Sequence, residues 1–389
     1  MKLRSFRSLN VRGKRVLVRA GFNVPTNARG HVQDDWRLER GLPTLQALLQ
    51  QRASLVVMTH RGRPQGRPSR ALSVRGIATA LGRRLRRPVR FLPSLMGPAV
   101  ARAVAQLKPG QVAMLENLRF APEEERNDAH FARQLAALGD VYVDDAFENA
   151  HRRHASMVAI TRYLPSAAGR LLEEEVATLE QALHKPKRPL VTIIGGAKIS
   201  TKIRLITTLL RHVDYLLLGG ALANAVLREK GIQIGRSFVE PNLGRIVRSI
   251  PIENPKLKIP IDVIAAASPR RGAASHRRAA GSVGAREFIY DIGPDTLELY
   301  GAVIRSAGTV IWNGPMGLIE QPTYSRGTRA IARAIAATRC HSILGGGETI
   351  QAVRAARLIR RFSFVSTGGG AMLEFLERRT LPALRALQR

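Results

Sequence analysis

The run Arg15-Val16-Leu17-Val18-Arg19 predicts a β-strand, residues 41–50 have the apolar spacing of an α-helix, and Ser54-Leu55-Val56-Val57-Met58 predicts a second, buried strand. The same alternation continues outward through Ala113-Met114-Leu115 and Val141-Tyr142-Val143. Parallel strands need a long crossover connection, usually a helix, so this order is typical of a parallel sheet. The first part of the chain is therefore expected to form an α/β unit.

A second series of strand signals follows the first and predicts a second sheet. It comprises residues 189–194, 215–218, 309–312, 342–344 and 362–365. Between the two series, residues 170–184 carry apolar side chains at helical spacing, which predicts a connecting helix. The predicted fold is therefore α/β with two lobes, each a parallel sheet flanked by helices in a Rossmann-like, three-layer αβα arrangement, joined by a hinge helix.

The domain boundaries follow from these two series. We place the amino-terminal lobe at residues 1–168, the connecting helix or hinge at 169–188 and the carboxy-terminal lobe at 189–370. Residues 371–389 are expected to form a carboxy-terminal segment that packs back toward the amino-terminal lobe. Residues 265–287 are rich in Ala, Gly, Ser and Arg, which predicts an exposed, mobile loop, with a basic arm that contacts nucleic acid as the alternative.

Length and composition limit the class of protein. A chain of 389 residues exceeds the ~250–300 residues at which one hydrophobic core stops growing. A hydrophobic content of 45% and a mean hydropathy of -0.09 are typical of a chain that buries a core, and they exclude a largely disordered one. No apolar run approaches the ~20 residues of a spanning helix, and residues 1–18 contain no secretory apolar stretch, so we expect a cytoplasmic protein without membrane contact.

The net charge of +33 and the pI near 11.6 are unusual for a metabolic enzyme. Such a charge attracts polyanions with a salt-dependent, sequence-independent affinity, which would suit a nucleic-acid binder. The arginines are, however, spread along the whole chain, and the aromatic content of 5% is low for a platform that stacks bases. We interpret the charge as a general surface property that permits incidental nucleic-acid binding at low salt.

Three strands of the second series end in glycine clusters followed by helical stretches. The clusters are Gly195-Gly196-Ala197-Lys198, Gly345-Gly346-Gly347-Glu348-Thr349 and Thr367-Gly368-Gly369-Gly370. Bare backbone N–H groups at a helix N-terminus bind phosphate oxygens closely, so three such loops, with Lys198 and Lys202 beside the first, indicate a polyphosphate site. None of them has the spacing of a Walker P-loop. Glycines that serve only as caps and turns would explain one such loop more readily than three.

Polar and cationic residues occupy the corresponding positions in the first series. Asn23, Arg37, His60, Arg63, Arg119 and Arg152 all lie at or just after predicted strand ends. Arginine forks bind carboxylate and phosphate in a bidentate manner, so several at one edge of a sheet suit a small substrate with two anionic groups. For any single arginine of so basic a chain, a solvated surface charge is the simpler interpretation.

Motifs along essentially the full chain resemble those of the phosphoglycerate kinase family. They are Arg19-Ala20-Gly21-Phe22-Asn23-Val24-Pro25, His60-Arg61-Gly62-Arg63-Pro64, Leu115-Glu116-Asn117-Leu118-Arg119-Phe120, Asp145-Ala146-Phe147 with Ala150-His151-Arg152, Gly195-Gly196-Ala197-Lys198, Trp312-Asn313-Gly314-Pro315-Met316-Gly317, the glycine loop at 345 and Ser366-Thr367-Gly368-Gly369-Gly370-Ala371. The resemblance implies one lobe that holds 3-phosphoglycerate, another that holds Mg-nucleotide, and closure by hinge bending.

The resemblance also implies roles for individual residues. Substrate binding falls to Gly21, Phe22, Asn23, Arg37, His60, Arg61, Gly62, Arg63, Arg119 and Arg152. Nucleotide binding falls to Lys198, Lys202, Glu320, Gly346, Gly347, Glu348 and Thr349. Arg37 and Lys198 would be the catalytic pair that neutralises charge on the transferring phosphoryl group, and Glu348 would contact Mg²⁺, directly or through water.

The chain departs from the family's pattern near both ligands. The family usually carries an acidic residue where this chain has Gly21, and that carboxylate contacts the substrate hydroxyl. Loss of a hydrogen bond to a charged group costs ~1.5–3 kcal/mol, so we expect weaker substrate binding or relaxed specificity. Glu348 replaces the usual Asp, and Glu148-Asn149 replaces the usual Gly-Thr before Ala150.

The leading functional hypothesis is a monomeric phosphoglycerate kinase of glycolysis and gluconeogenesis, which transfers a phosphoryl group reversibly between 1,3-bisphosphoglycerate or 3-phosphoglycerate and ADP or ATP, with Mg²⁺ as cofactor. A kinase for a related phosphorylated acid is the first alternative, motivated by Gly21. The second is a catalytically weak paralogue with a polyanion-binding or regulatory role, motivated by the net charge of +33.

Overall fold

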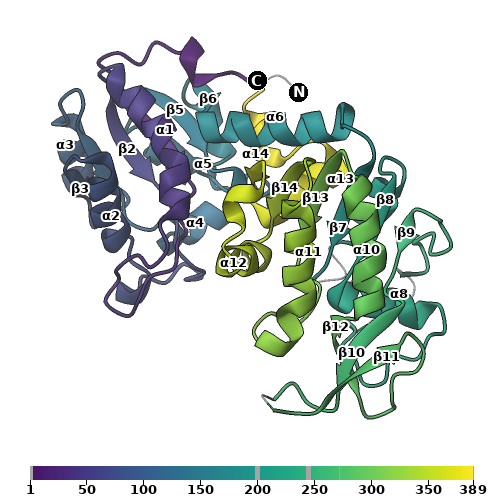
Figure 1. Cartoon of the computed structure of the whole chain (residues 1–389). Helices are drawn as coiled ribbons and strands as arrows, with labels where there is room; N and C mark the ends of the chain where they lie inside the picture. The colour runs from purple at the N-terminus through teal and green to yellow at the C-terminus, as the bar shows by residue number, and fades with distance from the viewer. Residues whose placement is uncertain (1–2, 198–201, 242–246, 271, 389) are drawn as a thin grey trace. The chain divides into compact units, whose positions relative to one another are not determined.

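The computed structural model describes residues 3–197, 202–241, 247–270 and 272–388. The chain divides into two compact units (Figure 1). Unit 1 comprises Met1–Ala177 together with Thr380–Arg389, and unit 2 comprises Thr178–Arg379. Each unit contains a parallel sheet flanked by helices, which confirms the α/β fold class predicted from the sequence.

Unit 1 is built on a six-stranded sheet in the order β3-β4-β2-β1-β5-β6. Its strands are β1 (Arg15–Ala20), β2 (Ser54–Met58), β3 (Val89–Phe91), β4 (Val112–Met114), β5 (Val141–Asp145) and β6 (Ser166–Ala168). All pairings are parallel, and central β1 aligns Val18 with Val57 of β2 and with Val143 of β5. Every residue of β2 and β5 is buried, as expected for a parallel sheet covered on both faces.

The helices of unit 1 include residues from both ends of the chain. They are α1 (Trp36–Gln50), α2 (Arg75–Leu85), α3 (Pro98–Ala105), α4 (Pro122–Glu125), α5 (Ala129–Ala136) and α14 (Pro382–Ala386), with 3-10 turns η1 (Phe6–Ser8), η2 (Arg70–Leu72), η3 (Leu118–Phe120), η4 (Phe147–Asn149) and η5 (Ala159–Arg162). The amide of Ala383 in α14 donates to the backbone oxygen of Ala150 at 3.1 Å. The last helix is thereby fastened to the loop after η4.

The helix expected at residues 170–184 is α6 (Arg170–His184), and the boundary between the units falls within it. Unit 2 has a second six-stranded parallel sheet in the order β15-β14-β13-β7-β8-β9. Its strands are β7 (Leu190–Ile194), β8 (Tyr215–Leu218), β9 (Leu257–Lys258), β13 (Thr309–Asn313), β14 (His341–Gly345) and β15 (Phe364–Val365). Its helices include α7 (Ile203–Leu210), α8 (Gly220–Glu229), α10 (Pro294–Ser306), α11 (Arg326–Ala336), α12 (Gly347–Ala355) and α13 (Gly369–Arg378), with η6 (Pro322–Ser325) and η7 (Ile359–Arg361).

The expectation of a mobile loop at residues 265–287 is wrong. This region contributes to a three-stranded antiparallel sheet of β10 (Asp262–Ala266), β11 (Ser275–Ala279) and β12 (Phe288–Ile292), in the order β11-β10-β12. Two arginines of β11 form ion pairs there: Nε of Arg277 lies 2.9 Å from Oδ2 of Asp262, and Nη2 of Arg278 lies 2.8 Å from Oε1 of Glu287. The composition suggested a loop because the basic side chains find their acidic partners outside β11, on β10 and directly before β12.

No helix among the described residues has the length and apolar character needed to cross a bilayer.

Candidate functional site

The loops after β1 and β2 meet at the carboxyl edge of the unit 1 sheet, because the two strands are parallel neighbours. Oδ1 of Asn23 accepts a hydrogen bond from the Gly62 amide, with 3.1 Å between N and O. The backbone oxygen of Asn23 accepts one from Nη1 of Arg37 at 2.7 Å, and the backbone oxygen of Gly62 accepts one from Nη1 of Arg119 at 2.8 Å. Hydrogen bonds thus join four of the predicted substrate-binding residues at one place.

His60 lies at the same edge and is held as a neutral donor. Its Nδ1 lies 3.0 Å from Nη2 of Arg19, and because a guanidinium can only donate, Nδ1 accepts and the ring proton resides on Nε2. Burial, followed by the charges of Arg19 and Arg119, lowers the pKa of His60 well below its usual value. The ring therefore offers an uncharged Nε2–H at neutral pH.

The remaining basic residues of this edge differ in exposure. Arg119 is buried, with Nε 3.2 Å from Oε1 of Glu125, whereas Arg152 is exposed. Burial and then the charges of Arg152 and Arg119 lower the pKa of His151 to about 4. The charges of Arg119 and Arg152 thus act on the same histidine and favour its neutral form.

Three other predicted substrate-binding residues have different surroundings. The ring of Phe22 is 1% exposed and lies in the core, while its amide donates to Oγ1 of Thr59 at 3.1 Å. The guanidinium of Arg61 donates to Oγ1 of Thr26 and to the backbone oxygen of Ser73. Arg63 is exposed directly after Gly62. The ring, the amide and the backbone oxygen of Phe22 therefore all make contacts within unit 1, the last by accepting from the Val24 amide at 2.9 Å.

Gly21 lies against η4. A Cβ added to Gly21 would come closer than 3.0 Å to three atoms of the Glu148 carboxyl group, a distance that real Cβ atoms essentially never show. Position 21 thus has no room for a side chain while Glu148 holds this place.

Sequence reasoning did not assign roles to Arg19, Glu124 and Ser156, which form a buried polar group beneath the edge. The sequence does contain a pattern that marks one of them, Arg19, as unusual. Arg19 stands between Val18 and Ala20 in a strand that is otherwise apolar after its first residue, and a fully buried arginine needs hydrogen-bonding partners.

In unit 2 the glycine loops gather at one edge of the sheet, because β7, β13 and β14 are adjacent: Asn313 aligns with both Ile194 and Gly345. Gly314 has a φ of 97°, and a Cβ there would overlap the backbone of Gly195. Only glycine permits the loops after β7 and β13 to approach this closely.

A cavity of about 410 Å³ lies beside these loops. It is lined by Gly196, Ala197, Gly220, Ala221, Ala223, Asn224, Phe238, Pro260, Val263, Phe288, Ile289, Tyr290, Asp291, Ile292, Pro315, Met316, Gly317, Leu318, Ile319, Glu320 and Glu348. Its walls are mainly apolar with a few polar groups among them, which is typical of a site that binds a small molecule.

Some of the predicted nucleotide-binding residues line this cavity, and others do not. Glu320 and Glu348 line it, and both are exposed. Lys202 is buried and its Nζ donates to the backbone oxygen of Gly195. Oγ1 of Thr349 accepts a hydrogen bond from the Gly314 amide at 2.9 Å, while Gly346 and Gly347 precede it at the start of α12. Lys198 falls outside the described residues.

Among the described residues, no group of three or more His, Cys, Asp or Glu side chains is arranged to hold a metal ion. Glu348 lines the cavity, as do the carboxyl-bearing residues Asp291 and Glu320. Mg²⁺ is commonly held by one or two carboxylates together with substrate phosphates and water. This donor set fits a magnesium ion that arrives with a nucleotide, and it does not fit an ion held by protein ligands alone.

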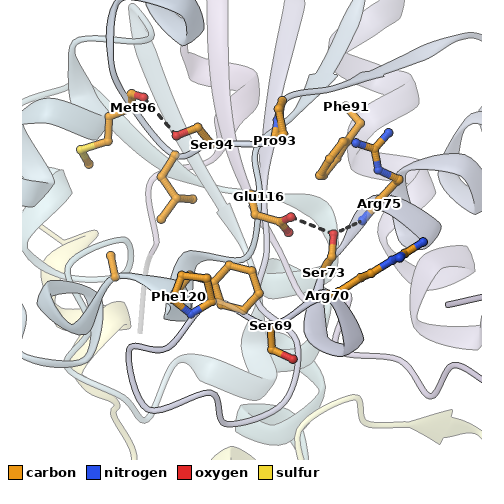
Figure 2. Close-up of a pocket in the computed structure, with 13 residues that line it drawn as sticks. Ser69, Arg70, Ser73, Arg75, Phe91, Pro93, Ser94, Met96, Glu116 and Phe120 are labelled. Atoms are coloured by element: carbon orange, nitrogen blue, oxygen red, sulfur yellow. Dashed lines mark hydrogen bonds between the residues drawn. The ribbon is translucent and has the colours of Figure 1, made fainter. Parts of the chain in front are cut away.

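A second cavity, of about 760 Å³, occurs in unit 1 at the ends of β3 and β4 (Figure 2). Figure 2 shows the Glu116 carboxylate pointing toward Ser73, whose hydroxyl donates to it at 2.7 Å. The amide of Val74 donates to the same carboxylate at 2.9 Å. Glu116 therefore fastens the start of α2, and the residues around this cavity include none that the sequence assigned to substrate.

Comparisons with known proteins agree with the geometry. A family model described as "Phosphoglycerate kinase" matches residues 6–379. A "Phosphoglycerate kinase" of Thermomicrobium roseum is 45% identical over 391 residues, covering 99% of each chain. The structure titled for phosphoglycerate kinase from Coxiella burnetii superposes with a TM-score of 0.86 at 37% identity, covering 100% of this chain and 99% of that one. The corresponding protein of Pyrococcus horikoshii gives 0.87 at 30% identity, covering 99% and 98%.

Proposed function

Because the chain belongs to the phosphoglycerate kinase family, we propose that it binds 3-phosphoglycerate in unit 1 and ATP or ADP in unit 2. It is a phosphotransferase whose acceptor is a carboxyl group. The reaction is the reversible transfer of a phosphoryl group between 1,3-bisphosphoglycerate and ADP, or in reverse between ATP and 3-phosphoglycerate.

One observation carries the substrate assignment: Asn23, Arg37, Gly62 and Arg119 are joined by hydrogen bonds beside the neutral Nε2–H of His60. 3-Phosphoglycerate carries a phosphate and a carboxylate, both of which accept hydrogen bonds. Guanidinium groups bind such anions in a bidentate manner, and a neutral imidazole N–H adds a donor without a further charge. Arg63 and Arg152, which are exposed, are the remaining arginines proposed to bind the substrate.

The cavity of unit 2 suits the nucleotide. Its apolar walls match a base, and the glycine loops after β7, β13 and β14 bring backbone N–H groups to the phosphates. Lys202, Glu320, Gly346, Gly347 and Thr349 are the residues proposed to bind it. Bound with the nucleotide, Mg²⁺ neutralises phosphate charge, and Glu348 is the side chain proposed to hold it, directly or through water.

The chemical step needs alignment and charge neutralisation rather than a protein nucleophile. A carboxylate oxygen of 3-phosphoglycerate forms the new bond to the γ-phosphorus of ATP, and the bond from that phosphorus to the bridging oxygen breaks, so the electron pair leaves with ADP. Arg37 and Lys198 are proposed to offset the negative charge on the moving group. Closure through a hinge at residues 169–188 is proposed to align the reactants and exclude water.

The test is ADP formation from ATP by the purified protein in the presence of Mg²⁺, with and without 3-phosphoglycerate. We expect turnover that requires the acid. Arg37→Ala and Lys198→Ala should each lower kcat by ~10²–10³, as loss of one group that stabilises transition-state charge does. The exposed Arg12→Ala serves as the matched control and should retain activity. Turnover that ignores 3-phosphoglycerate, or that survives both substitutions, contradicts the proposal.

Action as a monomer in the cytoplasm, within glycolysis or gluconeogenesis, belongs to the same proposal and rests on family membership. Light scattering of the purified chain tests the monomer. A mass of twice the 42.7 kDa of the sequence would contradict it.

A further inference from the structure

Gly21 and Glu148 come from different strand ends that meet at the edge of the unit 1 sheet. Gly21 follows β1, Glu148 lies in η4 after β5, and Ala20 of β1 aligns with Asp145 of β5. A Cβ on Gly21 would overlap Oε1, Oε2 and Cδ of Glu148. The Glu148 carboxylate therefore fills the volume into which any side chain at position 21 would extend.

One oxygen of this carboxylate has a hydrogen-bond donor within the protein and the other has none. Oε1 accepts a hydrogen bond from Nδ2 of Asn149 at 2.9 Å. Oε2 is buried and has no hydrogen-bond partner among the described residues. A buried carboxylate oxygen without a donor is costly, so its retention in a ligand site indicates that a ligand supplies the donor.

The surroundings of Glu148 keep it useful as an acceptor. Burial raises the pKa of Glu148 above its usual value, and the positive charges of Arg37 and Arg19, together with that of Arg119, offset part of this rise. Arg37 and Arg119 are among the residues proposed to bind the substrate, and Arg19 lies in the buried polar group beneath them. The cations around Glu148 thus favour the ionised form of its carboxyl group, which accepts hydrogen bonds, against the effect of burial.

The chemistry of 3-phosphoglycerate identifies the missing donor. Its phosphate and carboxylate only accept hydrogen bonds when ionised, and they would repel Glu148. The hydroxyl on its second carbon is its single hydrogen-bond donor. We propose that Oε2 of Glu148 accepts the hydrogen bond of this hydroxyl, and that Gly21 leaves the space that Glu148 occupies. This inference rests on the proposed function and deepens it.

The expectation of weaker binding from Gly21 is revised accordingly. The carboxylate that position 21 lacks is supplied from position 148, so we infer that selectivity for a hydroxyl-bearing acid is retained. Glu148 is then a specificity-determining residue that contacts the substrate, and Gly21 and Glu148 act as a coupled pair.

The experiment compares 3-phosphoglycerate with its analogue that lacks the hydroxyl, 3-phosphooxypropanoate, as substrates for the whole enzyme. Calorimetric titration of each acid without nucleotide gives a second readout. Loss of a hydrogen bond to a charged group corresponds to about a 10- to 150-fold change, so the native protein should prefer 3-phosphoglycerate by that factor. Glu148→Gln should shrink the preference, and Glu148→Ala should abolish it, mainly by weakening the binding of 3-phosphoglycerate.

Two further variants test the coupling. Gly21→Asp alone places two carboxyl groups in one volume and should lower affinity for 3-phosphoglycerate at least 10-fold, whereas Gly21→Asp combined with Glu148→Gly should recover most of the preference. Glu298→Ala, an exposed change on α10 of unit 2, is the control and should alter neither value. Circular dichroism checks that each variant is folded.

The outcomes separate this inference from the proposed function. If the native protein phosphorylates 3-phosphoglycerate but Glu148→Ala discriminates between the acids as before, the inference is overturned and the function stands. Equal loss for both acids in Glu148→Ala also overturns it, because a merely structural role would weaken both. Absence of turnover and of acid binding in the native protein would instead refute the function.

Discussion

Arg19 and Glu124 are joined through the hydroxyl of Ser156 in the interior of unit 1. Oγ of Ser156 accepts a hydrogen bond from Nε of Arg19 at 3.1 Å and donates one to Oε1 of Glu124 at 2.6 Å. Arg19 also donates to the backbone oxygen of Ala20 at 2.7 Å and to His60. Ser156 therefore links the charged side chain of β1 to that of α4 directly beneath the proposed substrate site.

Arg19→Met should lower the free energy of unfolding by about 3–5 kcal/mol, because it leaves Glu124 buried without the positive charge that offsets it. Urea titration measures this loss. Arg12→Met, the same substitution at an exposed arginine, is the matched control and should change the free energy of unfolding by less than ~0.5 kcal/mol. Equal stability of the two variants would show that the buried network contributes no net stabilisation.

His60→Ala should raise KM for 3-phosphoglycerate about 10- to 150-fold with a smaller change in kcat, since the neutral Nε2–H is proposed to donate to an anionic group of the bound acid. The KM of the native enzyme should show no inflection attributable to His60 between pH 6 and 8, because the pKa of His60 lies well below its usual value. Steady-state kinetics across this range provides the measurement. The exposed His130→Ala should leave KM unchanged, and an inflection that disappears only in His60→Ala would contradict the assignment of a neutral ring.

His154 should contribute to acid lability. Burial, and then the charges of Arg119 and Arg19, lowers its pKa to about 3. Between its usual value near 6.5 and pH 3 the unfolded chain binds a proton that the folded chain does not, so stability falls as pH falls through this window. The contribution approaches ~1.4 kcal/mol per pH unit within it.

His154→Gln should therefore flatten the fall in unfolding free energy between pH 6 and 4, as measured by urea titrations at each pH. Asp144 and Asp145, whose pKa values burial raises to about 7, act in the opposite direction, because the folded chain then binds the extra proton and stability falls as pH rises. They are present in both proteins, so the difference between the two profiles isolates His154. Superimposable profiles would show that His154 is not buried as a neutral ring.

Thr349→Val should destabilise the chain by about 1–3 kcal/mol and raise KM for ATP, because the amide of Gly314 loses its acceptor in a loop beside the nucleotide cavity. Thermal unfolding and kinetics measure the two effects. Thr349→Ser keeps the hydroxyl and should retain most of both properties. A serine variant as impaired as the valine variant would indicate that the methyl group, rather than the hydrogen bond, matters at this position.

Single-stranded DNA should bind the protein at low salt and dissociate as the salt concentration approaches physiological values, because a net charge of +33 attracts polyanions by counterion release. Filter binding across a salt series gives the slope of log affinity against log salt. Saturating ATP should displace little DNA if the contact is spread over the surface. Tight binding that persists at physiological salt would instead favour a role in which nucleic acid is a true partner.

The α/β fold and most of its strands were readable from local patterns. Apolar runs such as 54–58 and 190–194 are buried on both faces of their sheets. A short, continuous apolar run of this kind predicts a buried strand without information from the rest of the chain. The glycine loops after β7 and β14 were likewise predicted, because parallel strands bring their carboxyl ends to one edge, whereas Arg37, expected near a strand end, lies in the first turn of α1. Short strands such as β3, whose three residues are exposed or half-buried, carry too few apolar residues to be recognised.

Other features depend on which distant segments become neighbours. The two arginines of β11 suggested a loop until their acidic partners on β10 and near β12 were in place. Gly21 suggested a missing carboxylate, and only the pairing of β1 with β5 brings Glu148 into that space. Apolar periodicity and turn-forming residues involve only a few neighbouring positions, so the sequence alone reveals them. A contact between two strand ends depends on how the whole sheet packs, so only the tertiary structure reveals it.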